Sequence, residues 1–363
     1  MAATLRNDIV SVFRKILASM VGILLFSYFV SMGLGLYLLY ALPQGLSNAS
    51  RQVAQLTLSA FMIVNLSIPL GVSVGFFFMM IWLLYLGAFA LAWFDRPSFL
   101  SSFRNFITRF DMFRSNYLLL LPQLAAVVLV AVVLLQALQE SAGVQTGGIS
   151  FESPILGFLA VSYAPLVEEF SYRITTIGLL DGLYLVWKSM RLSPTEGRKG
   201  AAHVLMLTMW KPERAKELLG FDTIQKAGVT RGISRFEWLL LVVTSGAFGA
   251  VHYLAGGGWE IGKISTAILS GLAMGFVYLR YGAYAPILLH WFFNYYFGTF
   301  DLASQLNLEG GSSIAVGVEL LNMGVGILLV VAVIGASLVR VWPFKHRRKE
   351  SQPEYVGESP NVS

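Results

Sequence analysis

The stretch "APLVEEFSYR" at residues 164–173 places two adjacent glutamates and an arginine in a segment that is otherwise largely apolar. This segment belongs to an apolar run at about 155–178, which is long enough for a helix to cross a hydrocarbon core about 30 Å thick. Ionisable groups are costly at that depth, and those found there usually face the protein interior or a water-filled cavity. The stretch therefore predicts a membrane helix with a functional polar site.

The composition of the whole chain is that of a membrane protein. Of its 363 residues, 56% are hydrophobic and only 13% are charged. Because a bilayer offers no water to backbone groups, we expect the apolar runs to be helices. The predicted fold is all-α, a polytopic integral membrane protein with about eight transmembrane helices. We expect these helices at about 16–42, 69–94, 117–138, 155–178, 236–255, 263–280, 283–299 and 314–340.

Two further segments are expected to form helices that do not cross the membrane. The segment 52–67 is assigned to a helix on the outer surface, since the stretch between the first two spans is too short for another crossing. Near 100–114, phenylalanines recur at helical spacing with arginines interspersed. This pattern is typical of an amphipathic helix that lies in the membrane interface.

Lys and Arg are concentrated at the two ends of the chain and in alternate loops. Short cytoplasmic loops are enriched in these residues, so the net charge of +6 indicates orientation and not binding of nucleic acid. Both termini are predicted to be cytoplasmic. The predicted organisation is a cytoplasmic N-terminus (1–15), N-terminal transmembrane helices (16–154), a catalytic intramembrane core (155–300) with a cytoplasmic insert (189–235), a last transmembrane helix (301–340) and a basic, disordered tail (341–363).

The two glutamates of the opening stretch are expected to differ in their surroundings. In a helix, Glu169 and Arg173 stand four residues apart, a spacing that allows an ion pair. Glu168 is rotated by about 100° from its neighbour and can point elsewhere. One glutamate can therefore be structural while the other stays free.

Further polar residues interrupt two later apolar runs. His252 lies in "FGAVHYLAG", and His290 and Asn294 share one helix face in "LLHWFFNYYFG". Taken singly, such residues often serve only as interhelical hydrogen-bonding groups, and a buried Glu–Arg pair is often a packing element. Cysteine is absent, which excludes disulfides, thiol nucleophiles and thiolate metal ligands.

Together these groups supply the parts for peptide hydrolysis. A partly desolvated carboxylate is a competent general base for water, and an imidazole can help to hold that water or bind a metal. A second imidazole and a carboxamide can donate hydrogen bonds to the oxyanion of an attacked carbonyl.

The motifs Glu-Glu-x-x-x-Arg, Phe-x-x-x-His and His-x-x-x-Asn follow one another on three apolar helices. This order resembles the CAAX prenyl protease and bacteriocin-processing family of intramembrane proteases, over about 155–300. The resemblance implies that Glu168 and His252 activate water. It also implies that His290 and Asn294 form the oxyanion site.

The resemblance further implies that Glu169 and Arg173 support the geometry of the site. The family is often described as metalloproteases, and two His with a Glu could also bind zinc with one position open. Both alternatives remain: zinc held by Glu168, His252 and His290, or water activated by glutamate without a metal.

The leading hypothesis is an intramembrane endopeptidase that cuts a membrane-associated or prenylated protein, because such a substrate is already held in the bilayer. One alternative is a proton- or ion-coupled transporter that uses Glu168, His252 and His290 as a relay. Another is a membrane protein that no longer cleaves and serves in immunity or assembly. The site is expected to open towards the cytoplasm.

Overall fold

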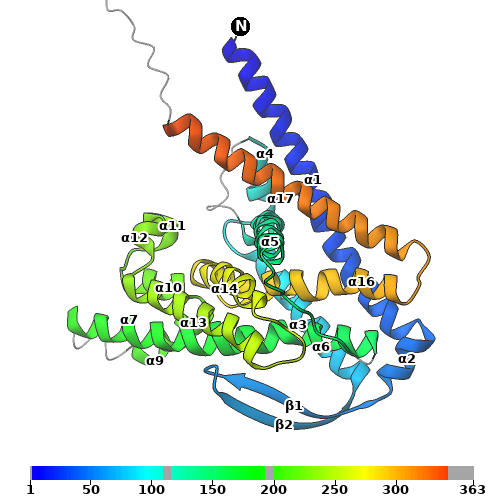
Figure 1. Cartoon of the computed structure of the whole chain (residues 1–363). Helices are drawn as coiled ribbons and strands as arrows, with labels where there is room; N and C mark the ends of the chain where they lie inside the picture. The colour runs from blue at the N-terminus through cyan, green and yellow to red at the C-terminus, as the bar shows by residue number, and fades with distance from the viewer. Residues whose placement is uncertain (1, 109–115, 152, 193–199, 342–363) are drawn as a thin grey trace, which may run out of the picture.

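The computed structural model describes residues 2–108, 116–151, 153–192 and 200–341 (Figure 1). Its first half contains five helices and two strands. These are α1 (Ala2–Tyr40), α2 (Pro43–Ala49), β1 (Gln52–Ala60), β2 (Val64–Ser73), α3 (Val74–Phe94), α4 (Phe99–Thr108) and α5 (Tyr117–Ser141).

The second half of the described chain is helical throughout, and two of its helices contain π-helical segments, labelled η1 and η2. The elements are α6 (Pro154–Glu169), η1 (Phe170–Ile177), α7 (Gly178–Leu192), α9 (Ala201–Trp210), α10 (Pro212–Leu218), α11 (Ile224–Ala227), α12 (Val229–Gly232), α13 (Arg235–Leu254), α14 (Gly262–Tyr281), α15 (Tyr284–Trp291), η2 (Phe292–Tyr296), α16 (Phe297–Gln305) and α17 (Gly311–Val341).

Six helices in the described part of the chain are long and apolar enough to cross a membrane, namely α1, α3, α5, α13, α14 and α17. The predicted fold class, an all-α polytopic membrane protein, is confirmed, but the predicted number of eight spans is not. The runs at 155–178 and 283–299 are each divided by a π segment, and no α-helical piece of either reaches 18 residues. These two divided helices carry most of the polar motif residues.

The surface helix predicted at 52–67 is wrong. The chain forms an antiparallel hairpin there, with β1 paired to β2 from Gln52 opposite Ser73 to Ala60 opposite Val64. The sequence "QVAQLTLSA" of β1 contains β-branched residues and partly alternates polar with apolar positions, a pattern that suits a half-exposed strand. Since β2 continues to Ser73, helix α3 begins later than the expected residue 69.

The tip of the hairpin is docked on the π segment η1. Phe61 and Met62 have positive φ angles of 52° and 65°, which is unusual for bulky residues. The amide of Phe61 donates to Thr175 Oγ1 over 3.0 Å, and the amide of Met62 donates to Ser171 Oγ over 3.0 Å. The hairpin is thereby fixed beside the helix that contains the glutamates.

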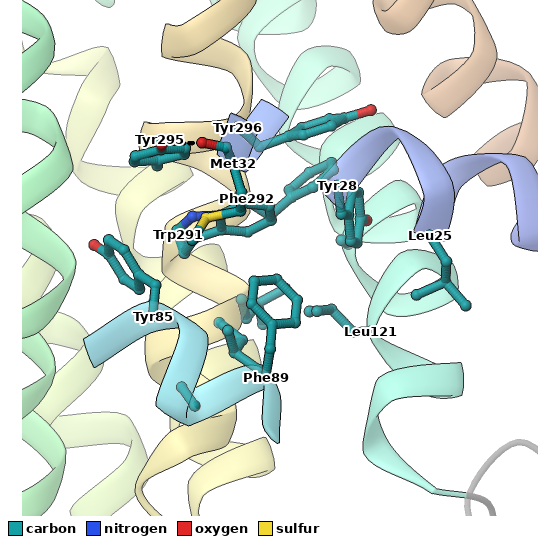
Figure 2. Packing of buried hydrophobic residues seen from close by; sticks show 14 of the residues in the cluster. Leu25, Tyr28, Met32, Tyr85, Phe89, Leu121, Trp291, Phe292, Tyr295 and Tyr296 are labelled. Atoms are coloured by element: carbon teal, nitrogen blue, oxygen red, sulfur yellow. Dashed lines mark hydrogen bonds between the residues drawn. The ribbon is translucent and has the colours of Figure 1, made fainter. Parts of the chain in front are cut away.

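An aromatic core holds helix α15–η2 against α1 and α3 (Figure 2). The indole of Trp291 meets the ring of Phe89 edge-on at 5.0 Å and that of Tyr28 at 5.4 Å between centroids. Such pairs add to the stabilisation that burial alone provides. Since one face of α15–η2 is packed into this core, His290 and Asn294 on another face are held at fixed positions.

Two sequence predictions fall partly outside the described residues. Helix α4 covers only 99–108 of the interfacial helix expected near 100–114, and Phe106 on it is buried in the core. Of the predicted tail at 341–363, only Val341 is described.

Candidate active site

Glu169 and Arg173 form the expected ion pair, and both side chains are fully buried. Arg173 Nε lies 3.2 Å from Glu169 Oε2, and its Nη1 donates to Glu169 Oε1 over 3.3 Å. The guanidinium also donates from Nη2 to the carbonyl oxygen of Gly271 in α14 over 3.1 Å. This ion pair therefore ties the helix of the glutamates to α14.

The π segment η1 begins directly after Glu169. The carbonyl oxygen of Ser171 accepts hydrogen bonds from two hydroxyl groups, Thr175 Oγ1 at 2.9 Å and Thr176 Oγ1 at 2.7 Å. Side chains that bond to a helical carbonyl disturb the regular ladder, and π segments occur often at functional sites. The hydroxyl groups that disturb the helix therefore follow directly after the charges of the opening stretch.

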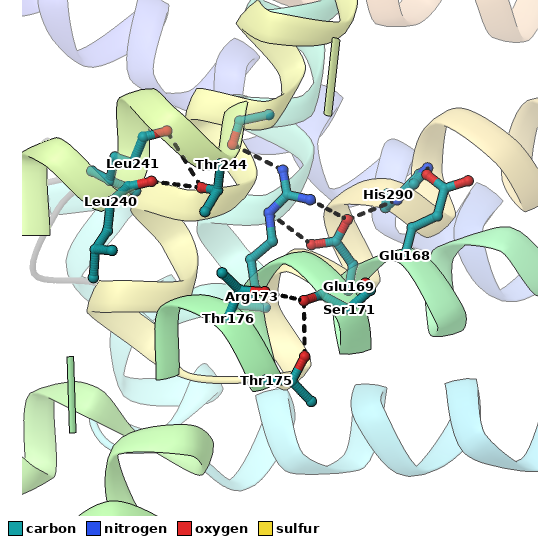
Figure 3. A network of polar contacts seen from close by, with 12 residues as sticks. Glu168, Glu169, Ser171, Arg173, Thr175, Thr176, Leu240, Leu241, Thr244 and His290 are labelled. Carbon is teal, nitrogen blue, oxygen red and sulfur yellow. Dashed lines mark hydrogen bonds and ion pairs between the residues drawn. The ribbon is translucent and has the colours of Figure 1, made fainter. Parts of the chain in front are cut away.

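His290 lies between the two glutamates (Figure 3). Its Nδ1 is 2.9 Å from Glu169 Oε1, and its Nε2 is 3.8 Å from Glu168 Oε2. The first contact fixes the orientation of the ring, because Glu169 is itself held by Arg173. The second directs the other ring nitrogen towards the free carboxylate.

Glu168 lines a cavity of about 440 Å³, whereas Glu169 is buried beneath it. Among the described residues, Oε2 of Glu168 has no hydrogen-bond partner. The two adjacent carboxylates are thus unequal in the way the helix geometry predicted. The cavity is lined by Val132, Ile149, Phe151, Ala160, Val161, Ala164, Glu168, Phe248, Val251, His252, Ala255, Gly256, Trp259, Lys263, Thr266, Ala267, Ser270, Met274, His290, Phe293 and Asn294.

Phe248 separates the two histidines that line the cavity. Its ring centroid is 4.6 Å from that of His252 and 5.9 Å from that of His290. The Nδ1 atom of His252 lies 2.7 Å from the carbonyl oxygen of Phe248, so we assign the proton to Nδ1 and leave Nε2 as the acceptor. Phe248 is therefore a positioning residue, although the sequence pattern showed it only as the start of a motif.

Asn294 lies in the π segment η2 and lines the same cavity. Its Nδ2 donates to the carbonyl oxygen of Val161 in α6 over 3.1 Å. One hydrogen of the amide holds the side chain to the helix of the glutamates. The second amide hydrogen can serve a ligand.

The proposed zinc ligands do not form a metal site. Glu168, His252 and His290 all line the cavity. Within the described ranges, however, no group of three or more His, Cys, Asp or Glu side chains is arranged to hold a metal ion. The metalloprotease description is therefore not supported, and no step below uses a metal.

Lys263 and Trp259 belong to the cavity but were missed in the sequence. Lys263 is the second residue of α14, at the start of the span expected at 263–280. A single lysine at the end of an apolar run can be either a loop charge or a group in a cavity. No signal in the sequence alone distinguishes them.

The cavity extends towards two connected loops, at 142–151 and 255–261. Gly148 N donates to Gly258 O over 3.0 Å, and Ile149 and Phe151 are 42% and 43% exposed. The predicted orientation places these loops on the outer side of the membrane. The expected opening of the cavity towards the cytoplasm is therefore inconsistent with the predicted orientation of the chain, in which both termini are cytoplasmic.

The fold and the cavity define a multi-pass helical membrane protein with a polar site among its apolar helices. A family model described as type II CAAX prenyl endopeptidase Rce1-like matches residues 150–296. This segment, which is less than half of the chain, is similar to that family, and the match agrees with the resemblance drawn from the three motifs. Neither the curated proteins nor the solved structures contain a match. This similarity supports a CAAX-type membrane protease in general.

Proposed function

We propose that the chain is an intramembrane endopeptidase that hydrolyses a peptide bond of a prenylated or otherwise membrane-associated protein. The observation that carries the proposal is the difference in contacts between the two adjacent glutamates. Glu169 is engaged by Arg173 and His290, while Glu168 lines the cavity and its Oε2 atom has no hydrogen-bond partner among the described residues. A free carboxylate at a cavity among apolar helices is the group that such a hydrolysis requires.

The reaction begins with a water molecule next to Glu168. The carboxylate takes a proton from the water, and the resulting hydroxide adds to the carbonyl carbon of the peptide bond. His252 holds the water through the Nε2 atom that its bond to Phe248 leaves as an acceptor. The proton then passes from Glu168 to the amine as the carbon–nitrogen bond breaks.

His290 and Asn294 stabilise the oxyanion formed in the first step. The carboxamide of Asn294 has one hydrogen free after its bond to Val161. Each ring nitrogen of His290 faces a carboxylate, and a hydrogen on Nε2 can be donated to the oxyanion while Nδ1 contacts Glu169. Donors held in place before the reaction are effective because they need no reorganisation.

A cleavage assay with a matched control tests this proposal. Purified protein in liposomes is incubated with libraries of prenylated peptides and membrane proteins, and the products are identified by mass spectrometry. Glu168→Gln should lower kcat by about 10² to 10⁴-fold. Glu319→Gln makes the same chemical change on an exposed face of the membrane helix α17, and it should retain cleavage.

Two results would contradict the proposal. One is a normal rate of cleavage by Glu168→Gln. The other is ion flux through liposomes without cleavage of any substrate, which would favour the transporter that the sequence left as an alternative.

A further inference from the structure

A second cavity, which shares no lining residue with the one at Glu168, lies at the ends of two membrane helices. Its volume is about 770 Å³, and its walls include the segment 94–97 after α3, helix α10 and the last residues of α14. Because α3 ends at Phe94 and α14 ends at Tyr281, this cavity lies near a membrane surface. The predicted orientation places that surface on the cytoplasmic side, where anionic lipids give the leaflet a negative potential.

Arg280 supplies a buried positive charge at this cavity. Its side chain is only 7% exposed, and its Nε and Nη2 atoms have no hydrogen-bond partner among the described residues. Its Nη1 atom lies 3.9 Å from Glu213 Oε1, which is too long for a hydrogen bond. That oxygen already accepts from the backbone amide of Gln225 over 2.8 Å. Since burial of a charge is costly without close partners, the guanidinium is only partly compensated by the protein.

The remaining charges at the cavity leave one more cation. Asp95 accepts from Lys211 Nζ over 3.0 Å, and Glu217 accepts from Arg214 Nη1 over 2.8 Å. Arg96 is exposed and makes no ion pair with a described residue. Of the described charged residues that line the cavity, four are basic and three are acidic, so positive charge is in excess.

An apolar groove begins beside this cavity. Its volume is about 540 Å³, and it runs along α3 and α15 with the exposed side chains of Leu83 and Leu84 on its wall. Phe94 lines both the groove and the polar cavity. Tyr284, which lines the groove, donates its hydroxyl to Asp95 at the polar cavity. A polar site at the membrane surface is thus continuous with an apolar groove that follows a membrane helix.

We propose that the cavity and the groove together bind one anionic phospholipid, with its phosphate beside Arg280 and Arg96 and one acyl chain along α3. The phosphate oxygens accept charge-assisted hydrogen bonds from guanidinium groups. Glu213 Oε2 has no hydrogen-bond partner among the described residues, so it can accept from a hydroxyl group of the lipid. The site therefore suits a headgroup with both a phosphate and a hydroxyl group, as in phosphatidylglycerol. The inference does not depend on the proposed peptidase reaction.

Native mass spectrometry of the purified full chain in a neutral detergent tests the inference. Three probes are titrated: phosphatidylglycerol, phosphatidylcholine with the same acyl chains, and glycerol 3-phosphate. The unmodified protein should bind phosphatidylglycerol about 10- to 100-fold more tightly than phosphatidylcholine, in which a quaternary ammonium group neutralises the phosphate. Glycerol 3-phosphate should bind more weakly than phosphatidylglycerol, because it has no chain to fill the groove.

Substitution of the two arginines tests the headgroup end of the site. Arg280→Gln and Arg96→Gln should each lower the preference for phosphatidylglycerol over phosphatidylcholine by about 10-fold. Arg51→Gln makes the same change in charge at an exposed position outside the cavity and should keep the preference. Because Arg96 is exposed, its variant decides the point if Arg280→Gln fails to fold.

Gly87 gives a test of the groove end. It lines the groove, and a Cβ atom added there would meet no atom within 4 Å, so Gly87→Leu places a side chain in the groove without a backbone clash. This variant should weaken the binding of both lipids and leave the binding of glycerol 3-phosphate unchanged. Gly317→Leu, at an exposed position of α17 where a Cβ also meets open space, is the matched control.

Three outcomes would overturn the inference. Equal binding of the two lipids by the unmodified protein would show that no anionic headgroup is recognised. A preference for phosphatidylglycerol that survives both arginine substitutions would place the bound lipid elsewhere on the protein. Binding of glycerol 3-phosphate as tight as that of phosphatidylglycerol, and unaffected by Gly87→Leu, would assign the cavity to a free phosphate compound and leave the groove without a role.

Discussion

Glu168 and Glu169 are neighbours in the sequence, yet their carboxylates have different surroundings. Glu169 is fully buried and contacts Arg173 and His290, both of which are also buried. A buried charge is tolerated when partners and hydrogen bonds replace its lost hydration. The same contacts hold the ring of His290 at the cavity. One carboxylate thus supports the structure so that the other can be exposed to a substrate.

Removal of one member of the Glu169–Arg173 pair should destabilise the protein. Arg173→Ala removes the guanidinium from a fully buried carboxylate, and loss of one partner of a buried pair typically costs about 3 to 5 kcal/mol. Its apparent melting temperature in detergent should therefore fall clearly below that of the unmodified protein. Unchanged thermal stability together with lost activity would instead make Arg173 a direct catalytic or substrate-binding group.

A double substitution separates stability from activity at the same place. Glu169→Leu with Arg173→Met replaces both charges by apolar groups of similar size, which can be nearly neutral for stability. The double variant should recover much of the lost stability. It should still lack activity, because a leucine side chain in place of Glu169 cannot accept a hydrogen bond and so cannot orient His290. Recovery of full activity would show that the contact between Glu169 and His290 has no role.

At the level of the elements, the hairpin β1–β2 has a turn made by unexpected residues. The loop between Ala60 and Val64 has three residues, and the two with positive φ are Phe61 and Met62, in a conformation that favours Asn and Gly. Bulky residues in this conformation are strained, commonly by about 1 to 3 kcal/mol. Two backbone amides of this turn bond to η1, so the turn and the π segment hold each other in place.

Substitution in the turn should relieve this strain. Phe61 is 40% exposed, so Phe61→Asn removes little packing and should raise the free energy of unfolding by about 1 kcal/mol. Phe61→Val, with a β-branched side chain at the same positive φ, should lower the melting temperature and is the matched control. A lower melting temperature for Phe61→Asn would show that contacts of the phenyl ring outweigh the strain.

The sequence predicted most of the helices and the cavity residues at the three motifs, because long apolar runs and rare charges are local signals. It did not predict the contact of Glu169 with His290, since the two residues are 121 positions apart. The sequence did not predict the hairpin, because a short apolar segment with only partial alternation fits a surface helix as well as a strand. Lys263 was missed because a loop charge and a cavity charge look alike in one sequence.

At the level of the whole molecule, the orientation in the membrane decides from which side a substrate reaches the site. The distribution of Lys and Arg predicts both termini in the cytoplasm, whereas the exposed cavity residues lie in the loops at 142–151 and 255–261. Those loops follow α5 and α13, after an odd number of predicted crossings. The cavity should therefore be accessible from the side opposite to the termini.

Single cysteines can test this arrangement, because the natural sequence has none. Ser150→Cys and Ser312→Cys should react with a membrane-impermeant maleimide added to intact cells. Thr4→Cys should react only after the membrane is permeabilised, and the unmodified protein is the blank. Labelling of Thr4→Cys and Ser150→Cys from the same side would contradict the predicted orientation.

The spacing of Glu169 and Arg173 within one helix has a consequence for biosynthesis. Synthesis runs from the N-terminus, so both charges enter the membrane before Gly271 and His290 have left the ribosome. A lone charge at the centre of a helix costs about 2.5 to 3.5 kcal/mol on insertion. Paired at a distance of four residues, the two charges neutralise each other from the start. The site is incomplete until α15 is inserted, but the charged helix already contains its own ion-pair partner.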